Sequence, residues 1–316
     1  MKSMHMWRGF LALGLLGHCL SIPAAAAGAY GNTITLTDNA VSAQLGQTVA
    51  YTIAGEVPDT SGFRTYGYTI QAEMTEGLTW DENPVVYFGE DQIAIRPEIT
   101  DSGFSVGFDM VKWQDRVGQP ITVTYTARIN EKSGEPGTAE ASTATLTCAC
   151  DPGDGIQSVT AEPVKEGVCT SALVPELVHA QDHSRKLADA QFVLRNAEEA
   201  YYRLEGDCVG WITEADDATF VTTDEMGTAR FSGLKNGTYY LQQIKAPEGF
   251  LLPEKPEAVE IHAQAYADRV VCVVEGHPGR QLPAAGGGGL AVMYIPGAIL
   301  TGIALILAAE KRRTDG

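Results

Sequence analysis

The chain has 316 residues and a formal net charge of −18 at pH 7. Between the two apolar terminal segments described below lie 17 basic and 38 acidic residues, so that part alone has a formal charge of −21. A surface this acidic repels phosphate backbones, and a nucleic-acid partner is therefore not expected.

An enzymatic function is also not expected. The sequence has no His-Glu-x-x-His pair and no glycine-rich phosphate loop, and we expect no Gly-x-Ser-x-Gly nucleophile elbow. Cys148 and Cys150 form a Cys-x-Cys pair, but no second pair and no nearby histidine at ligand spacing accompany it. We therefore predict no catalytic residue, no cofactor and no metal site.

The first 29 residues have the layout of a secretory signal peptide. Lys2 and Arg8 precede an apolar run over residues 10–22, and Pro23 leads into alanines that end at Ala29. Small residues at this point are typical of a signal-peptidase site, here after Ala27 or Ala29. We expect residues 1–29 to be removed and the remainder to be exported.

Short segments rich in β-branched and aromatic residues follow, separated by turn-forming residues. This pattern predicts an all-β fold of two tandem β-sandwiches. A turn-rich stretch at residues 151–155 indicates a boundary, which gives a first domain over 30–150, a linker over 151–172 and a second domain over 173–276. Residues 196–204 fit a short helix or a strand. The expected strands include residues 33–36, 48–53, 66–72, 121–129 and 270–274.

Motifs in the first domain occur in a fixed order: residues 46–53, Val57-Pro58, residues 77–79 and residues 121–130. Together they resemble the fimbrial isopeptide-forming domain of pilin subunits. No lysine lies between Tyr30 and Tyr51, and Ser142 lies where the asparagine of the closing strand is expected. The resemblance therefore implies the fold without the bond.

The second domain carries a larger set of motifs, at residues 187–192, 223–227, 231–234, 237–241 and 245–250. These resemble the Cna B-type, SpaA-like pilin domain, a prealbumin-like β-sandwich. In that family a lysine on the first strand attacks an asparagine or aspartate on the last strand, and a buried acid moves the protons. The product is an internal isopeptide bond.

The resemblance places these bond-forming positions at His179 for the lysine, Gln243 for the acid and Glu275 for the asparagine. An imidazole is not a primary amine, and an amide side chain cannot exchange the proton. Two interpretations stay open: a hydrogen-bonded cluster in which charged His179 faces Glu275, or substitutions without a role. We predict no isopeptide bond in either domain.

Cysteine is a second possible source of cross-links. Five cysteines follow the signal peptide, an odd number in an oxidising location, so at least one is free or pairs between chains. Cys148 and Cys150 point the same way on one strand, and each needs a distant partner. We favour a disulfide between Cys208 and Cys272, both inside the second domain.

The C-terminal segment, residues 282–316, begins with Leu282-Pro283-Ala284-Ala285-Gly286. An apolar stretch over residues 290–309 follows, and Lys311-Arg312-Arg313 come last. About 20 apolar residues can cross a bilayer, and the basic tail indicates a cytoplasmic C-terminus. The arrangement resembles the cell-wall sorting signal of Gram-positive surface proteins, usually Leu-Pro-x-Thr-Gly, with Ala285 in place of threonine. The resemblance implies that a sortase cleaves the Ala285–Gly286 bond.

We therefore expect an extracellular, sortase-anchored structural protein, either a pilin-like subunit or an adhesin stalk. Its expected partners are sortase, the membrane before processing, and peptidoglycan or other pilus subunits; an extracellular or host ligand is left open. One alternative is a membrane-retained surface binding protein that no sortase processes. A wall-associated hydrolase is a second alternative.

Polymerisation would need a lysine amine as acceptor. The resembled family usually places it in a Val-Tyr-Pro-Lys setting, whereas this chain has only Pro163-Val164-Lys165 in the predicted linker. An exposed linker lysine is most often simply solvated. We therefore expect a single wall-anchored or accessory subunit, with Lys165 as the candidate acceptor to test.

Overall fold

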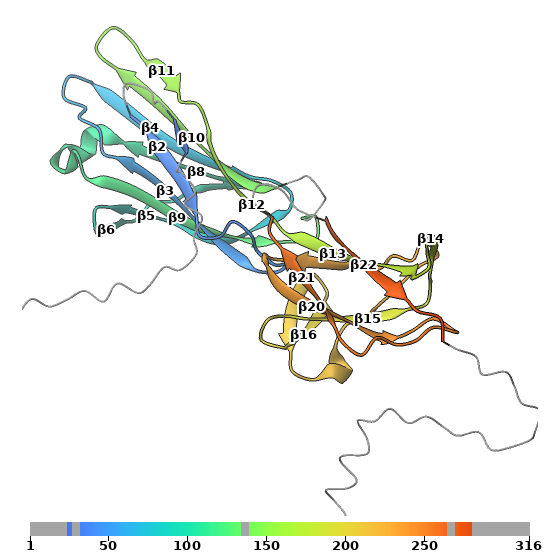
Figure 1. The fold of residues 1–316 in the computed structure, drawn as a ribbon. Helices are drawn as coiled ribbons and strands as arrows, with labels where there is room; N and C mark the ends of the chain where they lie inside the picture. The colour runs from blue at the N-terminus through green and yellow to red at the C-terminus, as the bar shows by residue number, and fades with distance from the viewer. Residues whose placement is uncertain (1–23, 27–31, 134–138, 264–268, 280–316) are drawn as a thin grey trace, which may run out of the picture. The chain divides into compact units, whose positions relative to one another are not determined.

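The computed structural model describes residues 24–26, 32–133, 139–263 and 269–279. These residues form two β-sandwiches in tandem (Figure 1). The all-β fold class is thus confirmed. Residues up to Pro278 belong to one compact unit.

The first sandwich has one sheet of order β1-β2-β3-β9-β5-β6 and a second of order β11-β10-β4-β8-β7, in which β12 also pairs with β10. A 3₁₀ segment, Met110–Arg116, follows β8. The strands are β1 (Ala24–Ala26), β2 (Ile34–Asp38), β3 (Thr48–Glu56), β4 (Thr65–Met74), β5 (Leu78–Phe88), β6 (Asp91–Ile93), β7 (Glu98–Thr100), β8 (Gly103–Asp109), β9 (Pro120–Ile129), β10 (Glu140–Asp151), β11 (Gln157–Thr160) and β12 (Val164–Val168).

Alternating side chains of these strands build the core of the first sandwich. On β3, Val49, Tyr51 and Ile53 are buried, whereas the residues between them are half-buried. Successive residues of a strand point to opposite faces, so this alternation sends every second side chain between the sheets. Aromatic rings fill much of the space, as in the stacked pair Tyr51 and Tyr125 with centroids 5.3 Å apart.

The segment predicted as a linker is instead part of the first sandwich. Within residues 151–172, both β11 and β12 pair antiparallel with β10. The turn-rich stretch makes a hairpin, because Asp151 Oδ1 accepts hydrogen bonds from the backbone N–H groups of Gly153 and Gly155. Glycine and proline therefore mark a turn within the domain, and the second sandwich starts after β12.

β1 lies inside the predicted signal peptide and pairs antiparallel with β2. Cleavage after Ala27 or Ala29 would remove β1 and leave β2 at the edge of its sheet. The signal peptide stays a prediction, because the rest of residues 1–29 lies outside the described residues.

The second sandwich has one sheet of order β14-β13-β19, in which β22 also pairs with β13, and a second of order β17-β16-β15-β20-β21, in which β18 pairs with β15. Residues 196–200 form a turn before β16, so a helix over 196–204 is wrong and the strand alternative holds for its second half. The strands are β13 (Ser171–His179), β14 (Asp182–Lys186), β15 (Gln191–Arg195), β16 (Tyr201–Glu205), β17 (Cys208–Ile212), β18 (Val221–Thr222), β19 (Phe231–Leu234), β20 (Gly237–Lys245), β21 (Glu257–Ile261) and β22 (Arg269–Gly276).

Candidate functional site

The predicted sorting signal, Leu282 to Gly286 with the apolar stretch over 290–309, lies outside the described residues. Among the residues that are described, no helix has the length and hydropathy needed to cross a membrane. Sortase processing and the membrane span therefore stay predictions from the sequence.

The first and last strands of the second sandwich lie side by side. β13 and β22 are parallel, with eight registered pairs that run from Ala172 and Arg269 to His179 and Gly276. On β22, Val270, Cys272 and Val274 pack against the core, whereas Val271, Val273 and Glu275 are exposed. The closing strands are thus next to each other at the place where the resembled family forms its bond.

The inward residue beside His179 is Gly276, one position after the predicted Glu275. A Cβ on Gly276 would lie 2.6 Å from Leu187 Cδ1 and 3.2 Å from Phe250 Cδ1, so an asparagine does not fit there without repacking. Glu275, the residue predicted for the asparagine position, therefore faces outward, because neighbouring residues of a strand point to opposite faces.

The three predicted positions also have separate partners. His179 Nδ1 accepts a hydrogen bond from Gln181 N at 3.1 Å, and its ring meets Phe250 edge-on. Buried Gln243 donates from Nε2 to Lys245 O at 3.1 Å, while Glu275 Oε1 lies 3.0 Å from His183 Nε2. The proposed ion pair of His179 with Glu275 is wrong, since His183 takes that place.

Ser142 lies in a buried polar cluster of the first sandwich. Its Oγ is 2.7 Å from Tyr125 Oη, and the Tyr125 ring stacks on Tyr51. Asp38 on β2 is the registered partner of Tyr51, and Glu166 on β12 is that of Ser142. The described part of this cluster contains carboxyls, phenols and a hydroxyl but no amine, so it offers no nucleophile for an isopeptide bond.

Asp38 supplies a carboxyl to this cluster that is only partly hydrogen-bonded among the described residues. Its Oδ2 atom is buried and accepts no hydrogen bond from the residues described. Burial, and to a smaller extent the Glu166 carboxylate, raise the pKa of Asp38 to about 6, against a lowering by the Ala40 N–H. Asp38 was not predicted from the sequence. Apolar and polar residues alternate over residues 34–38, and this alternation predicts that the Asp38 carboxyl points inward, like Ile34 and Leu36.

Asp38→Asn is expected to stabilise the protein above about pH 6. The unfolded carboxyl ionises near its ordinary value of 3.8, so between that pH and about 6 the folded state binds more protons. The stability contributed by Asp38 is therefore complete below pH 3.8 and is lost as the pH rises through 6. We expect the free energy of unfolding of the variant to be higher by roughly 1 kcal/mol at pH 7.5, a value that is discounted because the carboxyl is partly exposed.

Thermal unfolding of wild type and variant across pH 3.5 to 7.5 measures this effect. The difference should shrink to near zero at the acid end. A constant difference at all pH values would contradict the role given to Asp38 ionisation.

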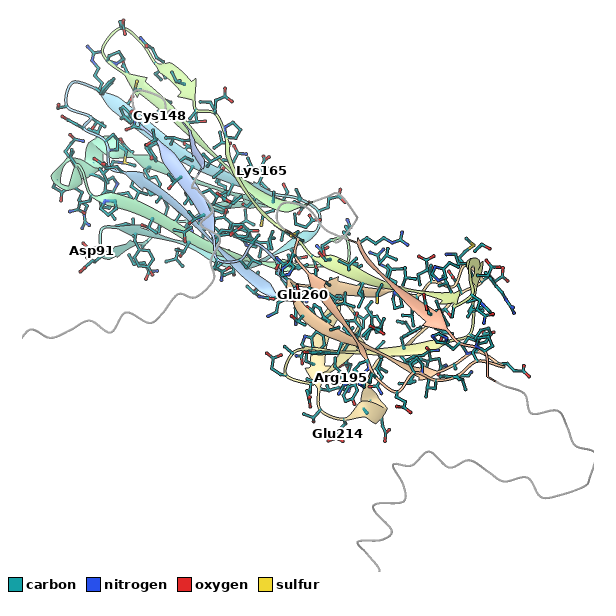
Figure 2. All side chains as sticks on the ribbon, in the orientation of Figure 1. Asp91, Cys148, Lys165, Arg195, Glu214 and Glu260 are labelled. Atoms are coloured by element: carbon teal, nitrogen blue, oxygen red, sulfur yellow. The ribbon has the colours of Figure 1, made fainter. Side chains whose placement is uncertain are left out.

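The predicted disulfide between Cys208 and Cys272 is absent, and both carry free thiols. They belong to different sheets: Cys272 lies beside Pro175 in the closing pair, whereas Cys208 Sγ lies 3.7 Å from Arg128 of the first sandwich. Cys148 and Cys150 are both buried on one face of β10, as their spacing predicts (Figure 2 labels Cys148). Within the described residues no group of His, Cys, Asp or Glu could hold a metal ion.

Lys165 is exposed on β12 and is registered opposite Thr143 (Figure 2). It lies on a strand of the first sandwich and not in a flexible linker. Its amine is accessible, and no described contact assigns it a function.

The expectation that no Gly-x-Ser-x-Gly pattern is present is wrong. Residues 103–107 spell Gly-Phe-Ser-Val-Gly, the pattern of a nucleophile elbow. That elbow requires a strand-to-helix turn, whereas Ser105 lies within β8 and pairs with Gln71 on β4. The motif here is an ordinary strand segment.

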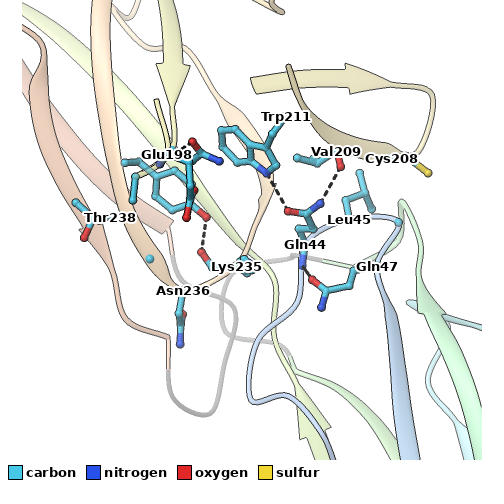
Figure 3. Close-up of a pocket in the computed structure, with 15 residues that line it drawn as sticks. Gln44, Leu45, Gln47, Glu198, Cys208, Val209, Trp211, Lys235, Asn236 and Thr238 are labelled. Atoms are coloured by element: carbon cyan, nitrogen blue, oxygen red, sulfur yellow. Dashed lines mark hydrogen bonds between the residues drawn. The ribbon is translucent and has the colours of Figure 1, made fainter. Parts of the chain in front are cut away.

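A cavity of about 520 Å³ lies where the first sandwich meets the second. Gln44, from the segment between β2 and β3, accepts a hydrogen bond from Trp211 Nε1 at 3.0 Å and donates one to Val209 O at 2.9 Å (Figure 3). The backbone of Leu45 also bonds Gly233 and Val209. No pattern in the sequence predicts this joint, because the hydrogen-bonded residues are 165 and 167 positions apart in the chain.

Comparison with known proteins agrees with this architecture. Residues 178–273 match the family model described as the SpaA prealbumin-like fold domain. No curated protein matches the sequence significantly. The structure is similar to the pilus 2b backbone protein of group B streptococcus (23% identity, 79% of this chain and 99% of that chain covered, TM-score 0.64).

Two further pilus proteins are similar in structure. The pilus backbone protein RrgB of Streptococcus pneumoniae has 13% identity, with 75% of this chain and 99% of that chain covered and a TM-score of 0.57. The major pilin subunit BcpA of Bacillus cereus has 17% identity, with 78% and 72% covered and a TM-score of 0.52. Residues 178–273 therefore form a SpaA-type prealbumin-like domain, in a chain with the tandem β-sandwich fold of Gram-positive pilus backbone proteins.

Proposed function

We propose that this protein is a pilin-like structural subunit on the surface of a Gram-positive bacterium, joined covalently to the cell wall through residues 282–286. The observation that carries the proposal is the combination of a SpaA-type domain with a two-sandwich fold that covers 99% of a pilus backbone protein. The order of motif, apolar stretch and basic tail in the sequence supports the covalent attachment.

The chemistry of attachment is performed on this chain by its partner. A sortase cysteine thiolate attacks the carbonyl carbon of Ala285, the peptide bond to Gly286 breaks, and the released amine of Gly286 takes a proton. An amine of the wall precursor or of another subunit then displaces the thiolate and forms a new amide. This chain needs no catalytic group of its own; it presents the bond and supplies a folded stalk.

Fractionation of cells tests the attachment. A covalently anchored protein resists extraction by hot detergent and is released by a muralytic enzyme. Extraction by detergent alone would support the alternative of a membrane-retained surface protein, which Ala285 favours because it departs from the usual threonine. A hydrolase would instead show turnover that is lost on mutation of a particular acid or histidine.

Lys165→Ala is expected to leave the size of the wall-released protein unchanged. The surroundings of Lys165 lack the aromatic residue and the order of the usual acceptor motif, so we favour a single anchored or accessory subunit. A denaturing gel of wall extracts should show one main band for both proteins, with Lys235→Ala as the matched control. A ladder of large species that disappears only in Lys165→Ala would contradict this preference and identify Lys165 as the acceptor.

A further inference from the structure

A groove with an apolar centre lies at the end of the second sandwich where the chain leaves it. We call it the exit groove; its cavity measures about 700 Å³. Leu251, Leu252 and Val273 form the apolar part and are 58%, 50% and 53% exposed. Neighbouring large apolar side chains with this exposure cost free energy in water, and they mark surfaces that bind a partner.

Three carboxylates accompany the apolar residues, those of Glu254, Glu257 and Glu275. Burial raises the pKa of the Cys272 thiol on β22, and the negative charge of Glu257 raises it further. An apolar centre with an acidic rim is complementary to a surface that offers apolar side chains surrounded by lysine or arginine.

The groove is tied to the point where the chain exits. Leu251 N donates a hydrogen bond to His277 O at 2.9 Å, and Phe250 forms a bridge with Pro278. Ala285 follows Pro278 by seven residues, which can span at most about 25 Å. A small folded domain is about 30 Å across. An enzyme that holds the Ala285–Gly286 bond is therefore within reach of the exit groove.

We infer that the exit groove is a docking surface for the sortase that processes this chain, separate from the five-residue motif. The inference rests on the proposed function. A second contact beside the motif raises the effective concentration of the cleavable bond at the active site. This matters here because Ala285 lacks the hydroxyl and methyl groups that threonine offers to the enzyme.

The test compares substrates of each sortase from the native host. The substrates are the full-length precursor in detergent and a synthetic peptide of residues 279–289, with kcat/KM for cleavage after Ala285 as the readout. We expect the precursor to exceed the peptide by tenfold or more. Two groove variants should lower kcat/KM of the precursor to that of the peptide: Leu251→Ser with Leu252→Ser, and Glu254→Gln with Glu257→Gln. The charge variant should also lose most of the salt dependence of kcat/KM.

The matched controls are Phe220→Ser and Ile156→Ser, which remove apolar side chains that are 53% and 76% exposed elsewhere on the protein. Sortase should cleave these control variants with the same kcat/KM as the wild-type precursor. Thermal unfolding checks that each variant is folded, and Val273→Thr replaces the double leucine variant if that one unfolds. Equal kcat/KM for precursor, groove variants and peptide would overturn the docking surface while leaving the proposed function intact. Failure of every sortase to cleave both substrates would overturn the proposed function itself.

Discussion

Pro283→Ala is expected to remove nearly all wall-attached protein, with the full-length precursor accumulating in the membrane fraction. Proline fixes φ near −65° and carries no backbone N–H, and alanine does not impose these restrictions on the motif. In the proposed mechanism, sortase recognises this restricted backbone before its cysteine thiolate attacks the Ala285 carbonyl. The readout is the ratio of muralytic-released to detergent-extracted protein in cells.

Two substitutions in the same motif serve as matched controls. Ala284→Ser changes the position that varies in the usual motif and should leave attachment unchanged. Ala285→Thr restores the usual motif and should keep or increase it. Wall attachment of Pro283→Ala at the wild-type level would show that residues 282–286 are not the sorting signal, and would favour the membrane-retained alternative.

The second sandwich is expected to unfold completely when the chain is pulled from both ends. Its first and last strands, β13 and β22, are held together by backbone pairing and core packing, and the sequence predicts no isopeptide bond between them. Nothing covalent then limits the extension. Unfolding about 100 residues should lengthen the tether by roughly 350 Å in single-molecule force measurements.

A designed disulfide provides the control for this experiment. Pro175 and Cys272 are registered partners on the adjacent strands, so Pro175→Cys places two thiols at a separation that a disulfide can bridge. The oxidised variant should lose the long extension step, and a reductant should restore it. Wild-type protein that shows no such step, or whose intact mass is lower by one ammonia molecule, would contradict the absence of an isopeptide bond.

The strands were predictable where the sequence alternates. Residues 48–53 and 121–129 carry a period of two over a long segment, and β3 and β9 confirm them. The domain boundary was not predictable in the same way. The turn at Asp151–Gly155 has the composition of a linker. Only the antiparallel pairing of β11 with β10 shows that the chain turns back into the first sandwich.

The directions of the side chains at the candidate site were not predictable from the sequence. Family motifs predict His179, Gln243 and Glu275 as the bond-forming positions, but they do not fix the face of β22, on which Glu275 is exposed and Gly276 is buried. The partner of Glu275 is His183, which comes from β14 across a hairpin. The contacts of Gln44 with Trp211 join residues far apart in the chain, and such contacts leave no periodic pattern in the sequence.

Mass spectrometry of the C-terminal peptide from protein released from the native cell wall tests the central claim most directly. The account predicts a peptide that ends at Ala285, with its carboxyl joined through an amide to a wall-precursor amine or to a lysine of another subunit. A peptide that continues through Gly286 into residues 290–309 would contradict covalent anchoring by sortase.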